Sequence, residues 1–372
     1  LDTLSAKICG ICLSASEDKG YYVVLNHKDS KKILGSIARN ALHKLFQDPS
    51  KTLVFHNAKF DLHILKKAKY KISAKIADTM LAAYSLEAGA RNLSLDAQVL
   101  KYFQHEMIPI TQLIGKGKSQ ISFAELTSAE AYFYSAEDAI FTFKLWKRLK
   151  TKLEETKLMD HYQNIEIPMT HILQKMEGRG ISINSEALES QAKSLGKRIN
   201  ELHDSIYQYA GQIFNIGSPK QLAEILFEEL GLPPSKKTKT GFSTDHSVLE
   251  KLKTEHPIIP AILETRELEK LKNTYVDVLP KLVHEKTNRI HTSYNQTIAA
   301  TGRLSSVNPN LQNIPIRTKD GKEIRAAFVA KDEDHVLLAA DYSQIELRIL
   351  AHLSQDENLC NAYKNGLDIH TQ

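Results

Sequence analysis

The sequence predicts an α/β layered domain, then a mainly helical region, and last a strand that runs directly into a helix. Three observations support this prediction. Strand-like and helical apolar patterns alternate over about residues 1–150. Long amphipathic helical patterns follow from about Thr151. Near the C-terminal end, the apolar run 336–340 ends at Asp341, and a helical pattern begins at once.

The composition is that of an ordinary globular protein with enough residues for two or three domains. The 372 residues are 42% hydrophobic and 25% charged, with a net charge of +5. This mildly basic balance allows a polyanionic partner but does not require one. No apolar run approaches membrane-spanning length and no signal peptide is found, so we expect no membrane partner. The chain starts on Leu1 and stops at Gln372 without a closing element, so we expect an internal piece of a longer protein.

The first region is expected to alternate short strands with helices. The pattern predicts strands over 7–14, 21–26 and 52–55. Thr127 and Glu130 have the spacing of a capping box at the start of the last, long helix. Helical spacing covers 32–46, 57–65, 78–86, 93–103 and 127–150.

Two pairs of polar side chains in this region have spacing suited to metal-dependent cleavage of a phosphodiester. Asn57 and Asp61 are four residues apart at a strand-to-helix turn, and Tyr134 and Asp138 are four apart on one helix face. Such cleavage needs carboxylates that converge on two ions roughly 4 Å apart and a group that orients the attacking water. Asp61 and Asp138 would serve the ions, and the Tyr134 hydroxyl would hold the water. The alternative is that these are polar surface residues.

The second region combines long helices with one basic loop. The loop 235–241 is rich in lysine and hydroxyl groups. Its Lys236 and Lys237 would clamp the phosphates of a duplex without reading bases. The alternative is a merely solvated loop. The helical patterns cover about 165–178, 185–210, a stretch from Ser218, and 262–278.

A turn-rich segment, 289–315, carries a dense set of hydrogen-bonding side chains. Such groups suit the minor groove, where the acceptors look alike for all base pairs. An enzyme that copies nucleic acid needs a check of this kind, which does not depend on sequence. The alternative is a loop whose Asn and Ser side chains bond to its own backbone. The side chains are Thr301, Arg303, Ser305, Ser306, Asn308, Asn310, Gln312 and Asn313.

The strand expected over 336–340 should place a carboxylate at the end of a rigid, buried element. Apolar residues spaced four apart over 345–353 predict one buried face on the following helix. Ser343 and Glu346 have the spacing of a capping box. Asp341, at the end of the strand, would suit Mg²⁺, which takes one or two protein carboxylates and fills its other positions with water and phosphate. The alternative for Asp341 is a helix N-cap.

The amino-acid sequence of this stretch resembles a motif of a known family. Residues 341–348, D-Y-S-Q-I-E-L-R, are similar to motif A of the family A DNA polymerases, the bacterial DNA polymerase I family. The match continues without a gap to residue 354 and again over 368–370. Residues 301–306, T-G-R-L-S-S, and 309–315, P-N-L-Q-N-I-P, are also similar to this family.

Two earlier stretches resemble the 3′–5′ proofreading exonuclease domain of the same family. F-H-N-A-K-F-D-L-H-I-L at 55–65 is similar to its second motif, and Y-S-A-E-D-A-I-F-T at 134–142 is similar to its third. Arg91 stands where the family has a DNA-contacting arginine, and Asn57 would contact DNA as well. The first motif of the family, Asp-x-Glu on the opening strand, is expected before Leu1.

The resemblance implies roles around motif A. Asp341 would bind both catalytic metals, and the main-chain carbonyl of Tyr342 would complete the shell of one of them. Glu346 would exclude a ribose 2′-hydroxyl. Arg303 would reach the minor groove at the primer end, although Asn295 stands where the family often has a histidine. Further nucleotide-binding residues would be Gln344, Ile345 and His370, and further DNA-binding residues would be Asn310, Gln312, Asn313 and Arg348.

For the whole chain, the resemblance implies an RNase H-like 3′–5′ exonuclease domain over 1–152, a linker and helical thumb over 153–290, and the start of an α+β palm over 291–372. It implies a DNA-directed DNA polymerase for replication and repair, with two-metal Mg²⁺ sites. Its partners would be primer–template DNA and deoxynucleoside triphosphates. The fingers and the second set of palm acids are expected after Gln372, so the chain alone should neither polymerise nor degrade DNA.

Location, assembly and two rival functions complete these expectations. We expect a monomer in the bacterial cytoplasm, associated with the nucleoid. Cys9 and Cys12 form a lone C-x-x-C without a second ligand pair, which favours core thiols in a reducing cytosol over a zinc site. One rival function is a stand-alone 3′–5′ exonuclease of the ribonuclease D type. The other is a non-catalytic DNA-binding scaffold with an inactive exonuclease domain.

Overall fold

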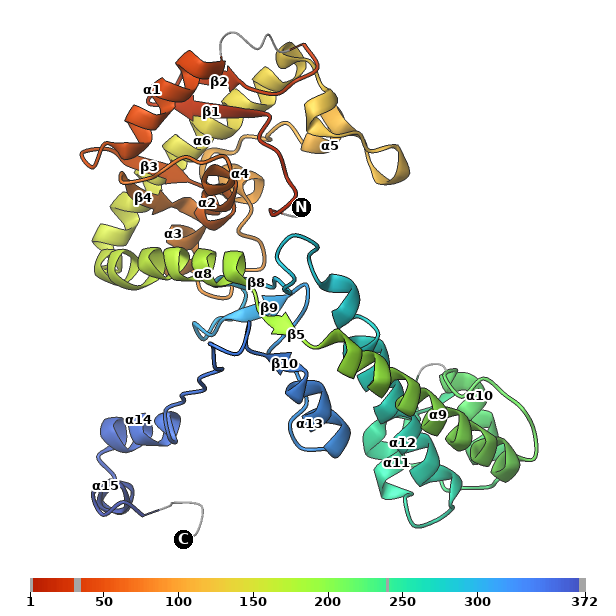
Figure 1. The fold of residues 1–372 in the computed structure, drawn as a ribbon. Helices are drawn as coiled ribbons and strands as arrows, with labels where there is room; N and C mark the ends of the chain where they lie inside the picture. The colour runs from red at the N-terminus through yellow and green to blue at the C-terminus, as the bar shows by residue number, and fades with distance from the viewer. Residues whose placement is uncertain (1–2, 30–34, 239–240, 368–372) are drawn as a thin grey trace. The chain divides into compact units, whose positions relative to one another are not determined.

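The computed structural model describes residues 3–29, 35–238 and 241–367. The chain divides into two compact units, Leu1–Phe328 and Val329–Gln372, and each is considered by itself below. Figure 1 shows the helices and strands in chain order. Among the described residues, no helix combines the length and the apolar character that crossing a membrane requires.

The first part of the larger unit is an α/β structure, as the alternating pattern predicts (Figure 1). Its elements are β1 (Gly10–Ser14), β2 (Gly20–Val24), α1 (Gly35–Gln47), β3 (Thr52–Phe55), α2 (Ala58–Lys67), β4 (Lys75–Asp78), α3 (Thr79–Leu86), α4 (Leu95–Phe103), α5 (Ile110–Ile114), η2 (Gly117–Ser119), η3 (Phe123–Glu125) and α6 (Ser128–Glu155). Strands β1 and β2 pair antiparallel, whereas β3 and β4 pair in parallel. Helix α6 packs against β1, β2 and α3, and its Leu145, Leu149 and Leu153 are fully buried.

The second part is built from long helices, and its core lies between α9 and α12. The elements are α7 (Met159–His161), η4 (Tyr162–Glu166), α8 (Ile167–Arg179), β5 (Ser182–Ile183), α9 (Ser185–Ala210), α10 (Pro219–Ala223), η5 (Glu224–Glu229), β6 (Lys237–Thr238), β7 (Gly241–Phe242), α11 (His246–Lys251), α12 (Ile258–Leu271), η6 (Lys272–Val276) and η7 (Leu279–Leu282). Ile206 of α9 and Ile258 and Ile262 of α12 are almost fully buried in one apolar cluster. This burial holds the two helices side by side.

The third part of this unit is a short strand pair and one helix, and the helix packs against α9 and α12. Its elements are β8 (Ser293–Asn295), β9 (Ser305–Val307) and α13 (Lys319–Ala326), and β10 (Phe328–Val329) lies at the boundary between the units. Strands β8 and β9 pair antiparallel. Ile324 of α13 is buried with Leu188, Leu271 and Ile290 in one cluster.

Two element predictions from the first unit need correction. The helix expected over 78–86 begins one residue later, because Asp78 is the last residue of strand β4, which the pattern did not predict. The helix expected over 262–278 is α12, which begins at Ile258 and passes into the π-helical turn η6 after Leu271. Apolar spacing does not distinguish an α-helix from a helix that ends in a π-turn, because both bury the same side of the chain.

The smaller unit overturns the central structural prediction. Residues 336–340 form no strand, and Val336 and Leu338 are 86% and 88% exposed. A strand buried on both faces needs neighbouring strands and covering helices. The helices described in this unit are α14 (Ile345–Ser354) and α15 (Glu357–Lys364), and no described strand pairs with 336–340.

The helix after this run also starts differently from the prediction. Its N-cap is Gln344, which has a left-handed backbone (φ 51°) and makes no capping hydrogen bond with its side chain. The capping box expected from Ser343 and Glu346 is therefore absent. The predicted apolar face is also not buried, since Ile349 is 50% and Leu353 is 75% exposed.

Candidate functional site

The turn that leads into α2 is held by one buried carboxylate, Asp78. This side chain is 1% exposed and accepts hydrogen bonds from the backbone N–H groups of Asn57 (3.1 Å) and Ala58 (2.7 Å). It also accepts from Met80 N (2.8 Å), so it caps the start of α3 as well. Asn57 has a left-handed backbone (φ 67°) and depends on this support.

Asp78 was not among the predicted site residues, although the sequence held a signal for it. An Asp followed by Thr at the end of an apolar strand is typical of a helix cap. The hydroxyl of Tyr162 accepts from the Asp78 N–H (2.7 Å) and lies 3.1 Å from the Asp78 carbonyl oxygen. Asp78 therefore acts by positioning the residues around it.

The structure brings Asp61, Tyr134 and Asp138 into one acidic site. Burial first, and then the charges of Asp78 and Asp138, raise the pKa of Asp61 to about 7. Burial also raises the pKa of Asp138 to about 7, against a lowering by its hydrogen bond with Tyr134. Burial, and then the charges of Asp138 and Asp61, raise the pKa of the Cys12 thiol on β1 to about 12. The thiol therefore lies close to both carboxylates.

Two half-buried carboxylates that repel each other form an electrostatic setting that a divalent cation would stabilise. Asp61 and Asp138 fit such an ion in charge and in ligand type. Within the described ranges, no group of three or more His, Cys, Asp or Glu converges as a complete metal site. The pair by itself therefore offers two of the several ligands that an ion would need.

The segment predicted to lie in the minor groove divides its polar side chains between two uses. Gln312 is exposed and bonds back to its own loop, since its Oε1 accepts from Ser306 N (3.1 Å) and its Nε2 donates to the Leu304 carbonyl (3.0 Å). The Ser306 hydroxyl is buried and accepts from Leu311 N (3.1 Å). These contacts match the alternative of a self-bonded loop. The side chains of Arg303, Asn310 and Asn313 lie at the surface.

The loop that carries Arg303 is also braced from the helical part. The Tyr275 hydroxyl, on the π-turn η6, donates to the carbonyl of Asn313. The Thr292 hydroxyl lies 2.7 Å from that of Ser306 and 2.8 Å from the Pro309 carbonyl. The loop is thus fixed from both sides, which leaves Arg303 as an exposed group on a rigid support.

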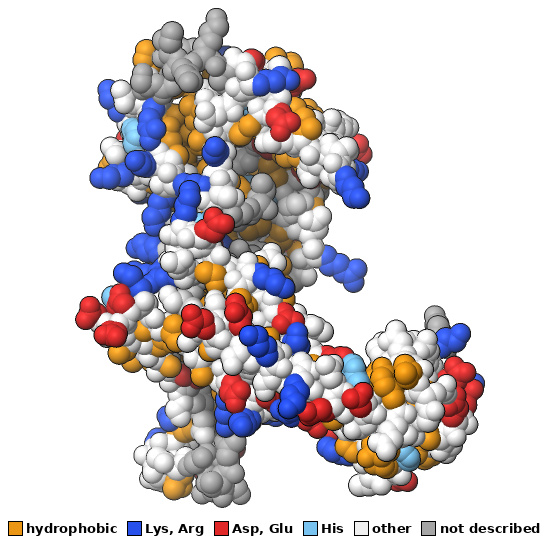
Figure 2. Space-filling model, turned by 45° about the vertical axis from the view of Figure 1, so that its right-hand side comes forward, with side chains coloured by type: hydrophobic (Ala, Val, Ile, Leu, Met, Phe, Trp, Pro, Cys, Tyr) orange, Lys and Arg blue, Asp and Glu red, His pale blue; other side chains and the backbone are white. Residues whose placement is uncertain are grey.

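The basic loop of the helical part is a short hairpin of β6 and β7. Lys236 lies 3.5 Å from Asp245, and Lys237 lies 5.8 Å from the ring centre of Phe242. Both lysines are exposed. On the face drawn in Figure 2, Lys and Arg side chains are interspersed with Asp and Glu, so net charge alone does not mark one binding surface.

The residues predicted around motif A lie at the surface of the smaller unit. Asp341 is exposed, and Tyr342 is 79% exposed. Arg348 braces this unit, since its Nε donates to the Ser343 carbonyl (2.9 Å) and its guanidinium lies 4.5 Å from the ring centre of Tyr363. Gln344 joins this contact through Tyr363, whose hydroxyl lies 3.1 Å from Gln344 Oε1.

The remaining predicted residues are not brought to any described site. Ile345 and Glu346 form the first turn of α14, and Ile345 is 42% exposed. Arg91 is exposed in the turn before α4. His370 lies outside the described residues.

Comparison with known proteins gives two family matches. The model for DNA polymerase family A matches residues 185–372, and the model for 3′-5′ exonuclease matches residues 1–154. The two matches follow the order that the motifs predicted. They confirm the resemblance to the exonuclease domain and the resemblance to the polymerase family.

Relatives and a solved structure agree with these matches. DNA polymerase I of Chloroflexus aurantiacus is 44% identical over 100% of this chain and 40% of its own length. DNA polymerase I of Treponema pallidum is 43% identical over 97% of this chain and 35% of its own length. The POL domain of Pol1 from M. smegmatis, in a complex with DNA primer-template and dNTP, has a TM-score of 0.80 and 35% identity over 94% of this chain and 57% of that one. The chain thus spans less than half the length of these curated relatives, and the predicted fold class is confirmed.

Proposed function

The chain belongs to DNA polymerase family A, and we propose that it supplies the excision and primer-binding parts of a DNA-directed DNA polymerase with 3′–5′ exonuclease activity. Support comes from two family matches in one chain and from relatives that are DNA polymerase I. We assign residues 1–152 to an exonuclease-like domain, 153–290 to a linker and thumb, and 291–372 to the start of a palm. The polymerase match over 185–372 disfavours a stand-alone nuclease.

Excision of a 3′ nucleotide would take place at Asp61, Tyr134 and Asp138. Two Mg²⁺ ions, when bound, would stabilise the charge that develops on the cleaved phosphate. Asp61 and Asp138 would hold them, and the carboxylates would then be ionised at neutral pH despite their raised pKa. The Tyr134 hydroxyl, which Asp138 orients through its hydrogen bond, would hold the attacking water. Asn57 and Arg91 would guide the strand.

Synthesis would use residues of the smaller unit for the metal and the nucleotide, and the braced loop of the larger unit would bind the primer end. Asp341 and the Tyr342 carbonyl would hold Mg²⁺, and Glu346 would exclude a ribose hydroxyl. Arg303, on its rigid support, would follow the minor groove at the primer end. The likeness to a structure with primer-template and dNTP supports these partners. The nucleotide would also meet Gln344, Ile345 and His370, and the duplex would meet Lys236, Lys237, Asn310, Gln312, Asn313 and Arg348.

The observation that carries this proposal is the convergence of Asp61, Tyr134 and Asp138 in a chain that also matches the polymerase family. The test uses the full-length gene product, which we propose is a monomer of the bacterial cytoplasm. We expect Mg²⁺-dependent extension of a recessed primer and Mg²⁺-dependent excision of a single-stranded 3′ end. Excision without extension would favour the stand-alone nuclease. DNA binding with neither activity would leave the scaffold alternative.

A further inference from the structure

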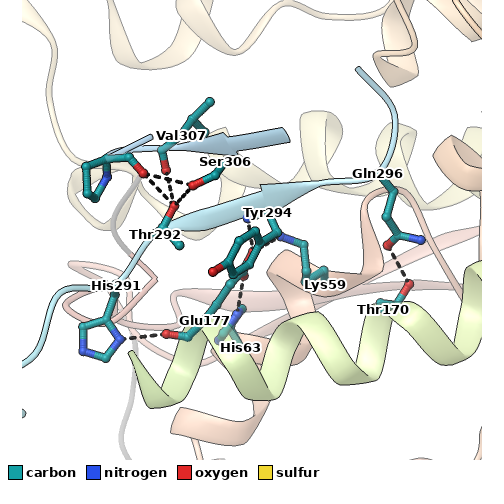
Figure 3. Close-up of polar contacts among 11 residues, drawn as sticks. Lys59, His63, Thr170, Glu177, His291, Thr292, Tyr294, Gln296, Ser306 and Val307 are labelled. Carbon is teal, nitrogen blue, oxygen red and sulfur yellow. Dashed lines mark hydrogen bonds and ion pairs between the residues drawn. The ribbon is translucent and has the colours of Figure 1, made fainter. Parts of the chain in front are cut away.

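Glu177, near the end of α8, joins three elements that are far apart in sequence. Its carboxylate is 8% exposed and forms ion pairs with Lys59 and with His63 Nε2 (2.8 Å), both on α2. It also accepts a hydrogen bond from the backbone N–H of Tyr294 on β8 (2.6 Å). Figure 3 shows Lys59, His63 and Tyr294 gathered around Glu177, with His291 bonded to its main-chain carbonyl (2.7 Å).

The α2 side of this contact is directly related to the excision site. Lys59 and His63 are four residues apart, so they lie on one face of α2. Asp61 lies between them in sequence and is rotated by about 200° from Lys59, onto the opposite face. One face of α2 therefore contacts Glu177, while the other presents Asp61 to Asp138.

The β8 side of the contact leads to the braced loop that carries Arg303, which is called the primer-binding loop from here on. Tyr294 pairs with Ser306 on β9, and β9 begins two residues after Arg303. Two further hydrogen bonds connect the residues after β8 to other elements. Gln296 Nε2 donates to the buried carboxylate of Glu166 (2.7 Å), and the Tyr84 hydroxyl donates to the Ala299 carbonyl (2.7 Å).

The Glu177 carboxylate is ionised in this setting. Burial alone would raise its pKa, but the hydrogen bonds from His63 and Lys59, the charge of Lys59 and the Tyr294 N–H bring the pKa below its usual range. A carboxylate that is bonded to a lysine ammonium group, a histidine ring nitrogen and a backbone N–H has all these donors around it, and removing it would leave the mostly buried Lys59 ammonium group without its partner. The Glu177 side chain thus links α2 to β8 through polar contacts with both elements.

We propose that Glu177 is a positioning residue that holds the excision site on α2 in fixed register with the strand pair β8–β9 and its primer-binding loop. Its task would be to give a mispaired primer end a constant path from the primer-binding loop to the excision site. This inference rests on the proposed function. It assigns no chemical step to Glu177, because the carboxylate faces away from Asp61.

The first test needs no enzymatic activity. Hydrogen–deuterium exchange of the chain itself is compared for the wild type, Glu177→Ala and a matched control, Asp320→Asn. Asp320 also forms a partly buried ion pair, 3.0 Å from Arg198, but it touches neither α2 nor β8. We expect Glu177→Ala to raise exchange in peptides 58–67 and 291–299 together, and the control to leave both unchanged. Faster exchange confined to α8 would overturn the proposal.

The second test measures primer transfer in the full-length gene product. The readout is the excision rate on a mispaired duplex primer divided by the rate on single-stranded DNA. Glu177→Ala should lower this ratio by roughly tenfold, because the excision site is displaced relative to the duplex. Glu177→Gln, which keeps one acceptor, should lie between. A purely structural role would lower both rates equally and leave the ratio unchanged, and that result would refute the inference while leaving the proposed function intact. If the wild type excised neither substrate, the proposed function would fail, and the exchange result would still decide whether Glu177 fastens the two elements.

Discussion

At the scale of single residues, Asp78 and Asp61 show two opposite uses of a buried carboxylate. Asp78 accepts hydrogen bonds from four backbone N–H groups, those of Asn57 and Ala58 at the start of α2 and those of Met80 and Leu81 in α3. Burial, and then the charges of Asp78 and Asp138, raise the pKa of Asp61. Asp78 therefore stabilises the fold through its hydrogen bonds, whereas the ionised form of Asp61 costs stability.

Asp78→Ala should lower the free energy of unfolding of the exonuclease part by about 2–4 kcal/mol, because two helix starts lose their cap and buried N–H groups lose an acceptor. Urea unfolding followed by Trp146 fluorescence measures this, since Trp146 is the single tryptophan and lies 5.7 Å from the buried Tyr162 ring. Asp356→Ala is the matched control, because Asp356 caps α15 with an exposed side chain. A loss no larger than in the control would contradict the capping role.

Asp61→Asn should make the metal-free chain more stable at pH 8. A pKa of about 7 in the folded state, against an ordinary value of 3.8, means that Asp61 stabilises the protonated fold below pH 4. That contribution is lost as the pH rises through 7. We therefore expect the Tm at pH 8 to rise by about 2–4 °C in the variant.

The gain should shrink as the pH is lowered towards 4, and Mg²⁺ should stabilise the wild type more than the variant. Thermal unfolding followed by Trp146 fluorescence at several pH values, with EDTA or Mg²⁺, gives both comparisons. An unchanged or lower Tm for the variant at pH 8 in EDTA would show that Asp61 is not held in an unfavourable environment.

At the scale of elements, the sequence predicts best those helices and strands whose apolar pattern and caps come from residues close together in the chain. The helices α6 and α9 were predicted because their apolar stripes are long and their caps are local, as at Thr127. The strand expected over 336–340 was wrong because its burial depends on neighbours, and apolar composition does not supply them. Strand β4 was missed because Asp78 serves as both strand end and helix cap.

Leu338→Lys tests the exposed run directly. Because Leu338 is 88% exposed, the substitution should change the Tm of the chain by less than about 1 °C. It should also reduce binding of an apolar dye, since it removes part of an exposed apolar patch. Leu149→Ala, at a fully buried position, should cost about 2–5 kcal/mol and serves as the positive control. A clear loss of Tm in Leu338→Lys would mean that this run is buried in solution.

The candidate sites were predicted to different degrees for a related reason. Spacing pointed to both Asp61, four residues after Asn57, and Asp138, four residues after Tyr134, and the family resemblance added the expectation that they serve one site. Spacing did not show that Gln312 bonds to Ser306 and Leu304, because these partners approach it only when the loop folds back. Nor did it point to Glu177, whose partners lie on α2 and β8.

At the scale of the whole molecule, one polypeptide carries two groups of candidate carboxylates in different units. One is the half-buried group of Asp61 and Asp138 in the larger unit, and the other is the exposed Asp341 in the smaller unit. The 3′-5′ exonuclease model matches residues 1–154, which include Asp61 and Asp138, and the DNA polymerase family A model matches residues 185–372, which include Asp341. We therefore propose excision at the first group and synthesis at the second. Each activity should therefore be removable without the other.

The most direct measurement compares Asp341→Ala and Asp138→Ala in the full-length gene product, with primer extension and single-strand excision assayed side by side in Mg²⁺. Asp341→Ala should reduce extension by roughly 10³-fold or more and leave excision of a single strand unchanged. Asp138→Ala should do the reverse. If Asp341→Ala extended primers at the wild-type rate, or if both variants lost both activities together, the assignment of two separate carboxylate sites would be wrong.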